Sequence, residues 1–287
     1  MAVDPFDPAE FKEKQRAEWQ RAAGGWRRWH DMLEADQAGG LVSATLVELA
    51  RIEPGALVLD VGGGYGEPSL TAAAAVGSKG MVVCTDLSAD MLAFARERAS
   101  AAGLHNVEFV ERDAEQLDFE PESFDAVISR ATLMLLPDVA GTLASLHSFL
   151  RPGGQLAASV WGAPSAVQFA AAVPVILEEL ELPPPPPGRP GMHALADPAR
   201  LAELVSSAGF RDVRTETVSA VFETDTPDQF TQFLRDVAPP ITRLVADRPA
   251  DVQEHVWARV TKTWNRFLDS DGHVRTHNEA ILVTGAR

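Results

Sequence analysis

The sequence predicts an α/β fold with a doubly wound, mostly parallel sheet of seven strands. Short apolar segments alternate with segments of helical periodicity through the middle of the chain, which is typical of repeated β-α units. The first apolar segment runs into a glycine-rich turn, and glycine or proline separates several of the later ones. With 287 residues, 46% of them hydrophobic, the chain is long enough for one large α/β domain and an added subdomain.

The strand predictions follow from apolar runs and alternation. The segment 56–61 is an apolar run apart from Asp60, as expected of a strand buried on both faces of a parallel sheet. Further strands are predicted at 81–86, 107–113, 124–130, 155–161, 213–224 and 277–287.

The helix predictions follow from periodicity and from residues typical of helix ends. Ser88 and Asp197 are good N-cap residues, and Pro198 suits a first helical turn. Helices are predicted at 67–75, 88–103, 141–150, 165–180 and 197–210, with a further helical stretch over 226–269.

The chain divides into five parts by composition and pattern. They are an N-terminal helical segment (1–40), a central core (41–161), the rest of the sheet domain with a polyproline connector at 182–191 (162–224), a helical insertion (225–272) and the final strand (273–287). Tryptophans 19, 26 and 29 fall near helical spacing in the first part, where a helix break is expected at Gly24–Gly25. This segment either packs onto the main domain as core or acts as a lid over a ligand.

Composition excludes several classes of protein. The net charge of −16 would repel a phosphate backbone, so no nucleic-acid partner is expected. The single Cys84 excludes an internal disulfide framework and a cysteine-rich metal site, and no metal is expected. The acidic N-terminus is no signal peptide, and glycine and proline interrupt the apolar stretch 156–177. A cytoplasmic protein without a membrane span is expected, as a monomer or a homodimer.

The turn VLDVGGGYGEPSL, at 58–70, narrows the choice of ligand. A P-loop requires a lysine where this chain has Glu67, and a dinucleotide fingerprint would place its third glycine at the same position. The observed spacing is Asp60-x-Gly62-x-Gly64-x-Gly66. An acid just before the glycines suits a ligand with a cationic amino group.

This turn resembles motif I of the class I S-adenosylmethionine-dependent methyltransferases. TDLSADML (85–92), ERDAEQLDF (111–119) and FLRPGGQLAASVW (149–161) are similar to further segments of the family, the last to its ubiquinone/menaquinone-biosynthesis type. The resemblance implies a Rossmann-like sheet with an antiparallel last strand. It also implies S-adenosylmethionine as cofactor, S-adenosylhomocysteine as product, and transfer of a methyl group.

The resemblance assigns roles to residues at the strand ends. Asp86 would bond the ribose hydroxyls, with Leu87 on the adenine, although an aspartate here also suits a helix cap. Asp113 would receive the adenine amino group, with the Ala114 amide at the ring, although Asp113 also suits a turn.

Asp60, Gly62 and Gly64 would surround the methionine part of the cofactor. Tyr65 either faces the methyl-transfer site or covers the methionine moiety, and Arg130 either contacts the methionyl carboxylate or caps a helix.

Acceptor selection is expected outside the central core. Trp29 and Trp161 are candidate substrate-binding residues, which favours a small apolar or aromatic acceptor methylated on oxygen, carbon or nitrogen. His30 and His193 are candidate general bases, although each also suits a structural role. Two alternatives of other classes stay open: a non-catalytic module that binds S-adenosylmethionine, and a nicotinamide-dependent oxidoreductase, which Glu67 and the position of Gly66 disfavour.

Overall fold

The structure, a computed structural model, describes residues 6–184, 186 and 188–287. Parts of two predictions, the absence of a signal peptide at the N-terminus and the polyproline connector at 182–191, lie outside the described residues. No helix within these described ranges is both long and apolar enough to cross a membrane.

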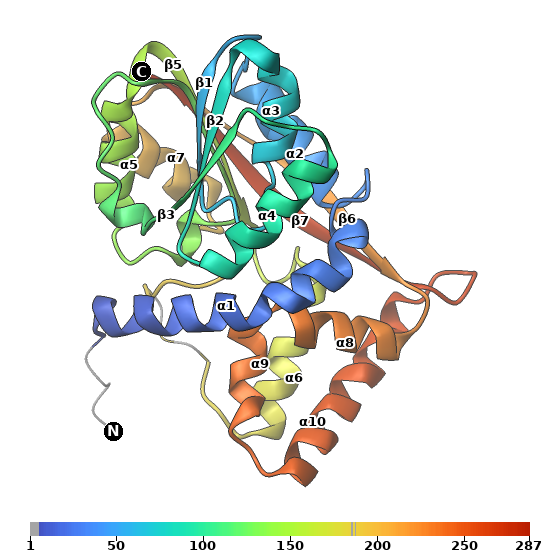
Figure 1. The fold of residues 1–287 in the computed structure, drawn as a ribbon. Helices are drawn as coiled ribbons and strands as arrows, with labels where there is room; N and C mark the ends of the chain where they lie inside the picture. Colours follow the sequence, from blue (N-terminus) through green and yellow to red (C-terminus); the bar gives the residue numbers. More distant parts are fainter. Residues whose placement is uncertain (1–5, 185, 187) are drawn as a thin grey trace.

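A seven-stranded sheet in the order β3-β2-β1-β4-β5-β7-β6 forms the centre of the molecule (Figure 1). Strands β1 to β5 run parallel, and β7 is antiparallel to both of its neighbours. The predicted mostly parallel sheet with an antiparallel last strand is therefore confirmed. The strands are β1 Leu57–Val61, β2 Met81–Asp86, β3 Val107–Glu111, β4 Phe124–Arg130, β5 Leu150–Trp161, β6 Arg211–Thr224 and β7 Val274–Ala286.

Helices cover both faces of this sheet, as expected of a doubly wound fold. One face carries α2 (Gly39–Leu49), α3 (Ser69–Val76) and α4 (Ala89–Ala101), and the other carries α5 (Val139–Phe149) and α7 (Pro198–Ser207). Two buried apolar clusters fill the spaces between these helices and the sheet. Each face of the sheet is thereby kept from water, which is the main favourable term in folding.

A third apolar cluster lies outside the sheet, among α1 (Pro8–Leu33) and four further helices. These are α6 (Ala172–Glu179), α8 (Pro227–Val237), α9 (Pro239–Ala246) and α10 (Ala250–Thr263). The predicted helix at 165–180 begins as a 3₁₀ turn at Gln168–Ala171. The predicted stretch 226–269 is three α-helices followed by a 3₁₀ turn at Trp264–Phe267. Figure 1 shows α1 crossing between the sheet domain and this helical layer.

The predicted break at Gly24–Gly25 is wrong, because α1 runs through both glycines without interruption. A Cβ atom on Gly25 would collide with the backbone carbonyl of Asp236 in α8, whereas nothing surrounds the same position of Gly24. Glycine at position 25 therefore allows two helices to approach closely, at a helix-propensity cost of about 1 kcal/mol.

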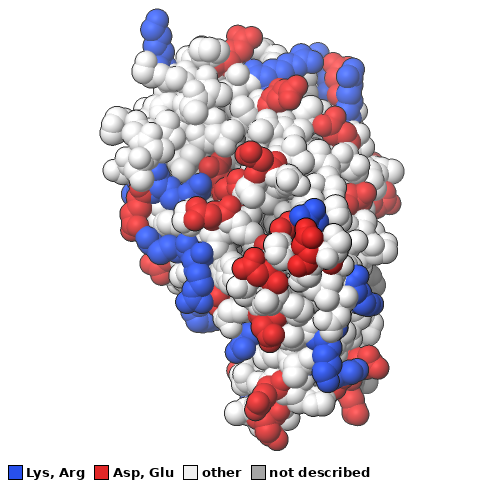
Figure 2. All heavy atoms as spheres, turned by 90° about the vertical axis from the view of Figure 1, so that its right-hand side faces the viewer, with Lys and Arg blue, Asp and Glu red and all other residues white. Residues whose placement is uncertain are grey.

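Acidic and basic side chains are interspersed on the face of the molecule shown in Figure 2. On the β6–β7 hairpin, for example, Glu223 contacts both Arg275 and His273. Exposed pairs of this kind contribute little to stability, so the three apolar clusters carry most of it.

Candidate functional site

A cavity of about 270 Å³ lies between the carboxyl ends of the central strands, α1, and helices α8 and α9. On the sheet side its lining includes Gly62, Gly63, Gly64, Tyr65, Asp86, Leu87, Asp113, Ala114, Arg130 and Thr132. On the helical side it includes Trp161, Phe169, Met192, Phe222, Phe233, Leu234, Val237, Ala238, Pro240 and Ile241, which we call the apolar chamber. Residues of α1 form a further wall.

The glycine turn brings bare backbone to the cavity surface. The N–H groups of Gly62 and Gly63 both donate to the carbonyl of Thr85, at 2.8 and 2.9 Å. Gly62 has φ +71°, and a Cβ there would collide with Thr132. Only glycine combines this left-handed conformation with so close an approach.

Asp60 lies behind the turn and does not line the cavity. Its side chain is fully buried, and Ser69 donates a hydrogen bond of 2.6 Å to Oδ2. A Cβ on Gly63 would stand 2.6 Å from that same oxygen, so the turn separates the carboxylate from the cavity. Burial raises the pKa of Asp60 to about 7. Its contact with a ligand stays a prediction.

Asp86 lies at the base of the cavity and joins the turn to α4. Its Oδ2 accepts the Gly64 N–H at 2.9 Å and its Oδ1 accepts the Ser88 N–H at 2.8 Å. Burial raises the pKa of Asp86 to about 6, against the lowering effect of these backbone bonds. Ser88 is the N-cap residue of α4, so the carboxylate of Asp86 fixes the turn rather than capping the helix itself.

Asp113 and Ala114 line the cavity beside the N-terminal part of α1. Lys12 of α1 forms ion pairs with Asp113 Oδ2 at 2.7 Å and with Glu115 at 2.9 Å. Burial alone would lower the pKa of Lys12, but its bonds to the two carboxylates raise the value above normal.

Tyr65 and Arg130 also line the cavity, and both form hydrogen bonds with Glu34. The Tyr65 hydroxyl donates to Glu34, and Arg130 Nη2 donates to Glu34 at 2.8 Å and to the Tyr65 oxygen at 2.6 Å. Arg130 Nη1 donates to the Gly39 carbonyl and to Ser43 Oγ, at 2.9 and 3.0 Å. Burial raises the pKa of Tyr65 well above its usual value, so the phenol stays neutral.

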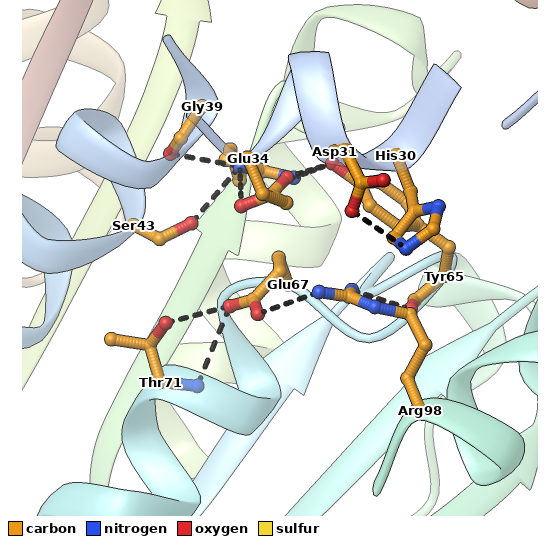
Figure 3. Close-up of polar contacts among 10 residues, drawn as sticks. His30, Asp31, Glu34, Gly39, Ser43, Tyr65, Glu67, Thr71 and Arg98 are labelled. Carbon is orange, nitrogen blue, oxygen red and sulfur yellow. Dashed lines mark hydrogen bonds and ion pairs between the residues drawn. The ribbon is translucent and has the colours of Figure 1, made fainter. Parts of the chain in front are cut away.

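Glu67, the residue that argued against phosphate ligands in the sequence, does not line the cavity. Thr71 Oγ1 donates to its carboxylate at 2.7 Å, and Arg98 pairs with it at 3.3 Å (Figure 3). The carboxylate is therefore satisfied within the protein.

The apolar chamber contains a contiguous aromatic group. The Trp161 ring lies 5.2 Å from that of Phe169 and 6.2 Å from that of Phe222, and Phe222 lies 5.7 Å from Phe233. These rings come from β5, β6, α8 and the 3₁₀ turn before α6.

A family model described as "Methyltransferase domain" matches residues 58–154. This segment is a methyltransferase domain. The predicted resemblance to class I S-adenosylmethionine-dependent methyltransferases of the ubiquinone/menaquinone-biosynthesis type is confirmed for this region by this match together with the relatives described next. The domain contains the glycine turn, Asp86, Asp113 and Arg130, whereas α1 and α6 to α10 lie outside it.

Curated relatives resemble the same region. Demethylmenaquinone methyltransferase of Listeria monocytogenes is 39% identical over 39% of this chain and 47% of its own length. Aklanonic acid methyltransferase DauC of Streptomyces is 38% identical over 39% of this chain and 51% of its own length. The chain therefore spans about half the length of the curated relatives it matches.

A solved structure supports the fold of the whole chain. Phosphoethanolamine N-methyltransferase 2 of Haemonchus contortus, in complex with phosphomonomethylethanolamine and S-adenosylhomocysteine, aligns with a TM-score of 0.59. The alignment covers 100% of this chain and 61% of that one, at 19% identity.

Three of the predicted site residues do not line the cavity. His30 contacts the carbonyl of Arg27 through Nδ1 and the carboxylate of Asp31 through Nε2. His193 is bonded to the Gly162 carbonyl at 2.7 Å, and its burial lowers its pKa. The Trp29 indole donates to Asp236 at 2.8 Å and thereby links α1 to α8. Their catalytic and substrate-binding roles stay predictions.

Sequence reasoning missed cavity residues on α1 and next to it. Gln15 lines the cavity in the same helical stripe as Phe11, Trp19 and Trp26. A polar residue within an aromatic stripe was the available signal. Lys12, which also lines the cavity, carries no such signal, because its partners are distant in sequence. The same holds for Glu34, which does not line the cavity but binds Tyr65 and Arg130.

Proposed function

We propose that this protein transfers the methyl group of S-adenosylmethionine to a small apolar or aromatic acceptor, with S-adenosylhomocysteine as product. The observation that carries the proposal is a single cavity that joins the glycine turn and Asp86 to the apolar chamber. The names of the two curated relatives, which refer to demethylmenaquinone and aklanonic acid, support a small-molecule acceptor. The S-adenosylhomocysteine complex of the Haemonchus contortus enzyme supports the cofactor.

The sheet side of the cavity fits the cofactor. Asp86 keeps lone pairs for the ribose hydroxyls after accepting its two backbone N–H groups. Leu87 and Ala114 provide apolar contact for the adenine, and Asp113 provides an acceptor for its amino group. The bare backbone at Gly62 to Gly64 leaves room for the methionine part.

The apolar chamber fits an acceptor that brings its own nucleophile. None of the ten described residues that form the chamber has a titratable side chain. S-adenosylmethionine, when bound, would supply a sulfonium methyl group: a bond forms between the acceptor's nucleophile and the methyl carbon as the carbon–sulfur bond breaks and the thioether leaves. The residues of the chamber would exclude water and hold the acceptor in line for this displacement, so that alignment and desolvation supply the rate.

Two measurements test this function. Calorimetry should show binding of S-adenosylhomocysteine and no comparable binding of NADH. Mass spectrometry over a panel of phenols, quinols, aromatic polyketides and amines should then show a product 14 mass units heavier than its acceptor, the mass of one CH₂ group. Binding of NADH without S-adenosylhomocysteine would refute the proposal. Cofactor binding with no methylated product from any acceptor class would favour the non-catalytic alternative.

A further inference from the structure

Helix α1 carries two unsatisfied, buried polar atoms on side chains that line the cavity. Among the residues that the structure describes, three buried side-chain atoms have no hydrogen-bond partner: Gln15 Oε1, Trp26 Nε1 and Asp60 Oδ1. Gln15, with 6% of its surface exposed, and Trp26 both belong to α1 and both line the cavity. Buried polar groups are normally paired, and leaving one unpaired costs about 1–3 kcal/mol. A ligand in the cavity would explain both atoms.

The two atoms lie toward opposite ends of the predicted cofactor site. Gln15 and Trp26 are separated by eleven residues, or about 16 Å along the helix axis. Gln15 lies one turn beyond Lys12, which pairs with Asp113, and its neighbour Arg16 donates to the Leu87 carbonyl at 2.9 Å. This is the end of the cavity proposed for the adenosyl group.

Trp26 lies at the other end, beside the glycine turn. Its ring centroid is 4.9 Å from that of Tyr65, which follows Gly64 directly. Arg130 is the cation that lines the cavity beside Tyr65, but it already donates to Glu34, Gly39 and Ser43. A carboxylate at this end therefore requires another donor.

The chemistry of the two atoms matches the two ends of the cofactor. The adenosyl end offers hydrogen-bond donors, namely an amino group and two hydroxyls, and Gln15 Oε1 is an acceptor. The amino-acid end offers a carboxylate, and the Trp26 indole is a donor only. We propose that α1 is a cofactor-binding wall in which Trp26 Nε1 donates to the methionyl carboxylate and Gln15 Oε1 accepts from the adenosyl group. This inference rests on the proposed function, since it concerns the same cofactor.

The test compares two ligands that differ at one end. S-adenosylhomocysteine carries the amino-acid group, whereas 5′-methylthioadenosine keeps the adenosyl thioether and lacks it. By calorimetry, Trp26→Phe should weaken S-adenosylhomocysteine about 10- to 100-fold and leave 5′-methylthioadenosine unchanged, because a bond to a charged group is lost. Gln15→Leu should weaken both ligands equally, by about 3- to 10-fold.

Matched controls lie on the same helix. Trp29→Phe removes the same indole N–H at a position bonded to Asp236, and Gln20→Leu removes an amide that does not line this cavity. Neither should change the affinity for either ligand. The indole ¹⁵N–¹H spectrum of the wild-type protein provides a second measurement of ligand binding. It does not depend on the substituted proteins folding correctly. Its Trp26 signal should move with S-adenosylhomocysteine and much less with 5′-methylthioadenosine, and the Trp29 signal should stay.

The outcomes separate this inference from the proposed function. If wild-type protein binds S-adenosylhomocysteine, but Trp26→Phe binds it equally well or loses both ligands alike, the inference is overturned and the proposed function stands. A Trp26 indole signal unmoved by S-adenosylhomocysteine would overturn it as well. If wild-type protein binds neither ligand, the proposed function is refuted, and the inference about α1 is refuted with it.

Discussion

Replacing Asp86 with asparagine tests the centre of the proposed cofactor site. Each carboxylate oxygen accepts one backbone N–H, from Gly64 or from Ser88. An amide can serve only one of these donors, so the other loses its acceptor, at a cost of about 1–3 kcal/mol in the free energy of unfolding. We also expect at least one charged bond to the ribose to be lost, worth about 1.5–3 kcal/mol. This corresponds to roughly 10- to 100-fold weaker binding of S-adenosylhomocysteine.

The same contact predicts a pH dependence. Burial raises the pKa of Asp86 to about 6, so the free protein takes up a proton there as the pH falls below that value. Because the ribose hydroxyls bind best to the ionised form, the affinity should fall by up to about tenfold per pH unit below pH 6. In Asp86→Asn the affinity should not change over this pH range.

Calorimetry with S-adenosylhomocysteine at pH 5 and pH 8, together with urea unfolding, measures both effects. Asp90→Asn, an exposed change in the first turn of α4, is the matched control and should alter neither. If Asp86→Asn lowers stability but keeps the wild-type affinity, Asp86 only fixes the glycine turn, and the ribose site has been misplaced.

Three other changes probe the core, the chamber and the helix contact. Because the folded pKa of Asp60, about 7, exceeds its unfolded value, this carboxyl should lower the free energy of unfolding by roughly 4 kcal/mol from pH 4 to pH 8. Urea unfolding should therefore show a smaller decline over this pH range in Asp60→Asn than in wild type, the remainder coming from groups such as Asp86. Phe222→Leu should raise the KM for the acceptor and leave S-adenosylhomocysteine affinity unchanged, and equal loss of both would refute a separate acceptor chamber. Gly25→Ala should lower stability by about 1–3 kcal/mol through its collision with Asp236, whereas Gly24→Ala should raise it by up to about 1 kcal/mol. Similar values for both variants would contradict the close helix contact.

The cofactor half of the site could be predicted because its positions follow from local order. Strands β1, β2 and β3 run parallel, so the residues at their carboxyl ends meet at one edge of the sheet. Gly62, Asp86 and Asp113 each follow or end such a strand, and all three line the cavity. Their arrangement in space therefore follows from the strand order.

The rest of the site depends on contacts between segments that are distant in the sequence. Hydrophobic periodicity gives no information about such contacts. Lys12 and Glu115 are 103 residues apart, and Glu34 and Arg130 are 96 apart. The pair Gly24–Gly25 predicted a break because glycine weakens an isolated helix. In the structure, Gly25 instead allows α1 to contact α8, because any side chain at this position would collide with the carbonyl of Asp236.

Helix α1 connects the sheet side and the helical side of the cavity. Substitutions in α1 and substitutions in the apolar chamber should therefore affect the specificity for the acceptor differently. Lys12 pairs with Asp113 on the sheet side, whereas Arg28 and Trp29 both bind Asp236 of α8 on the helical side. The apolar stripe of α1 packs between these anchors and carries most of its stability, since exposed pairs contribute little. A substitution on that stripe therefore alters the wall shared by cofactor and acceptor. A substitution within the chamber, such as at Phe222, alters the acceptor side alone.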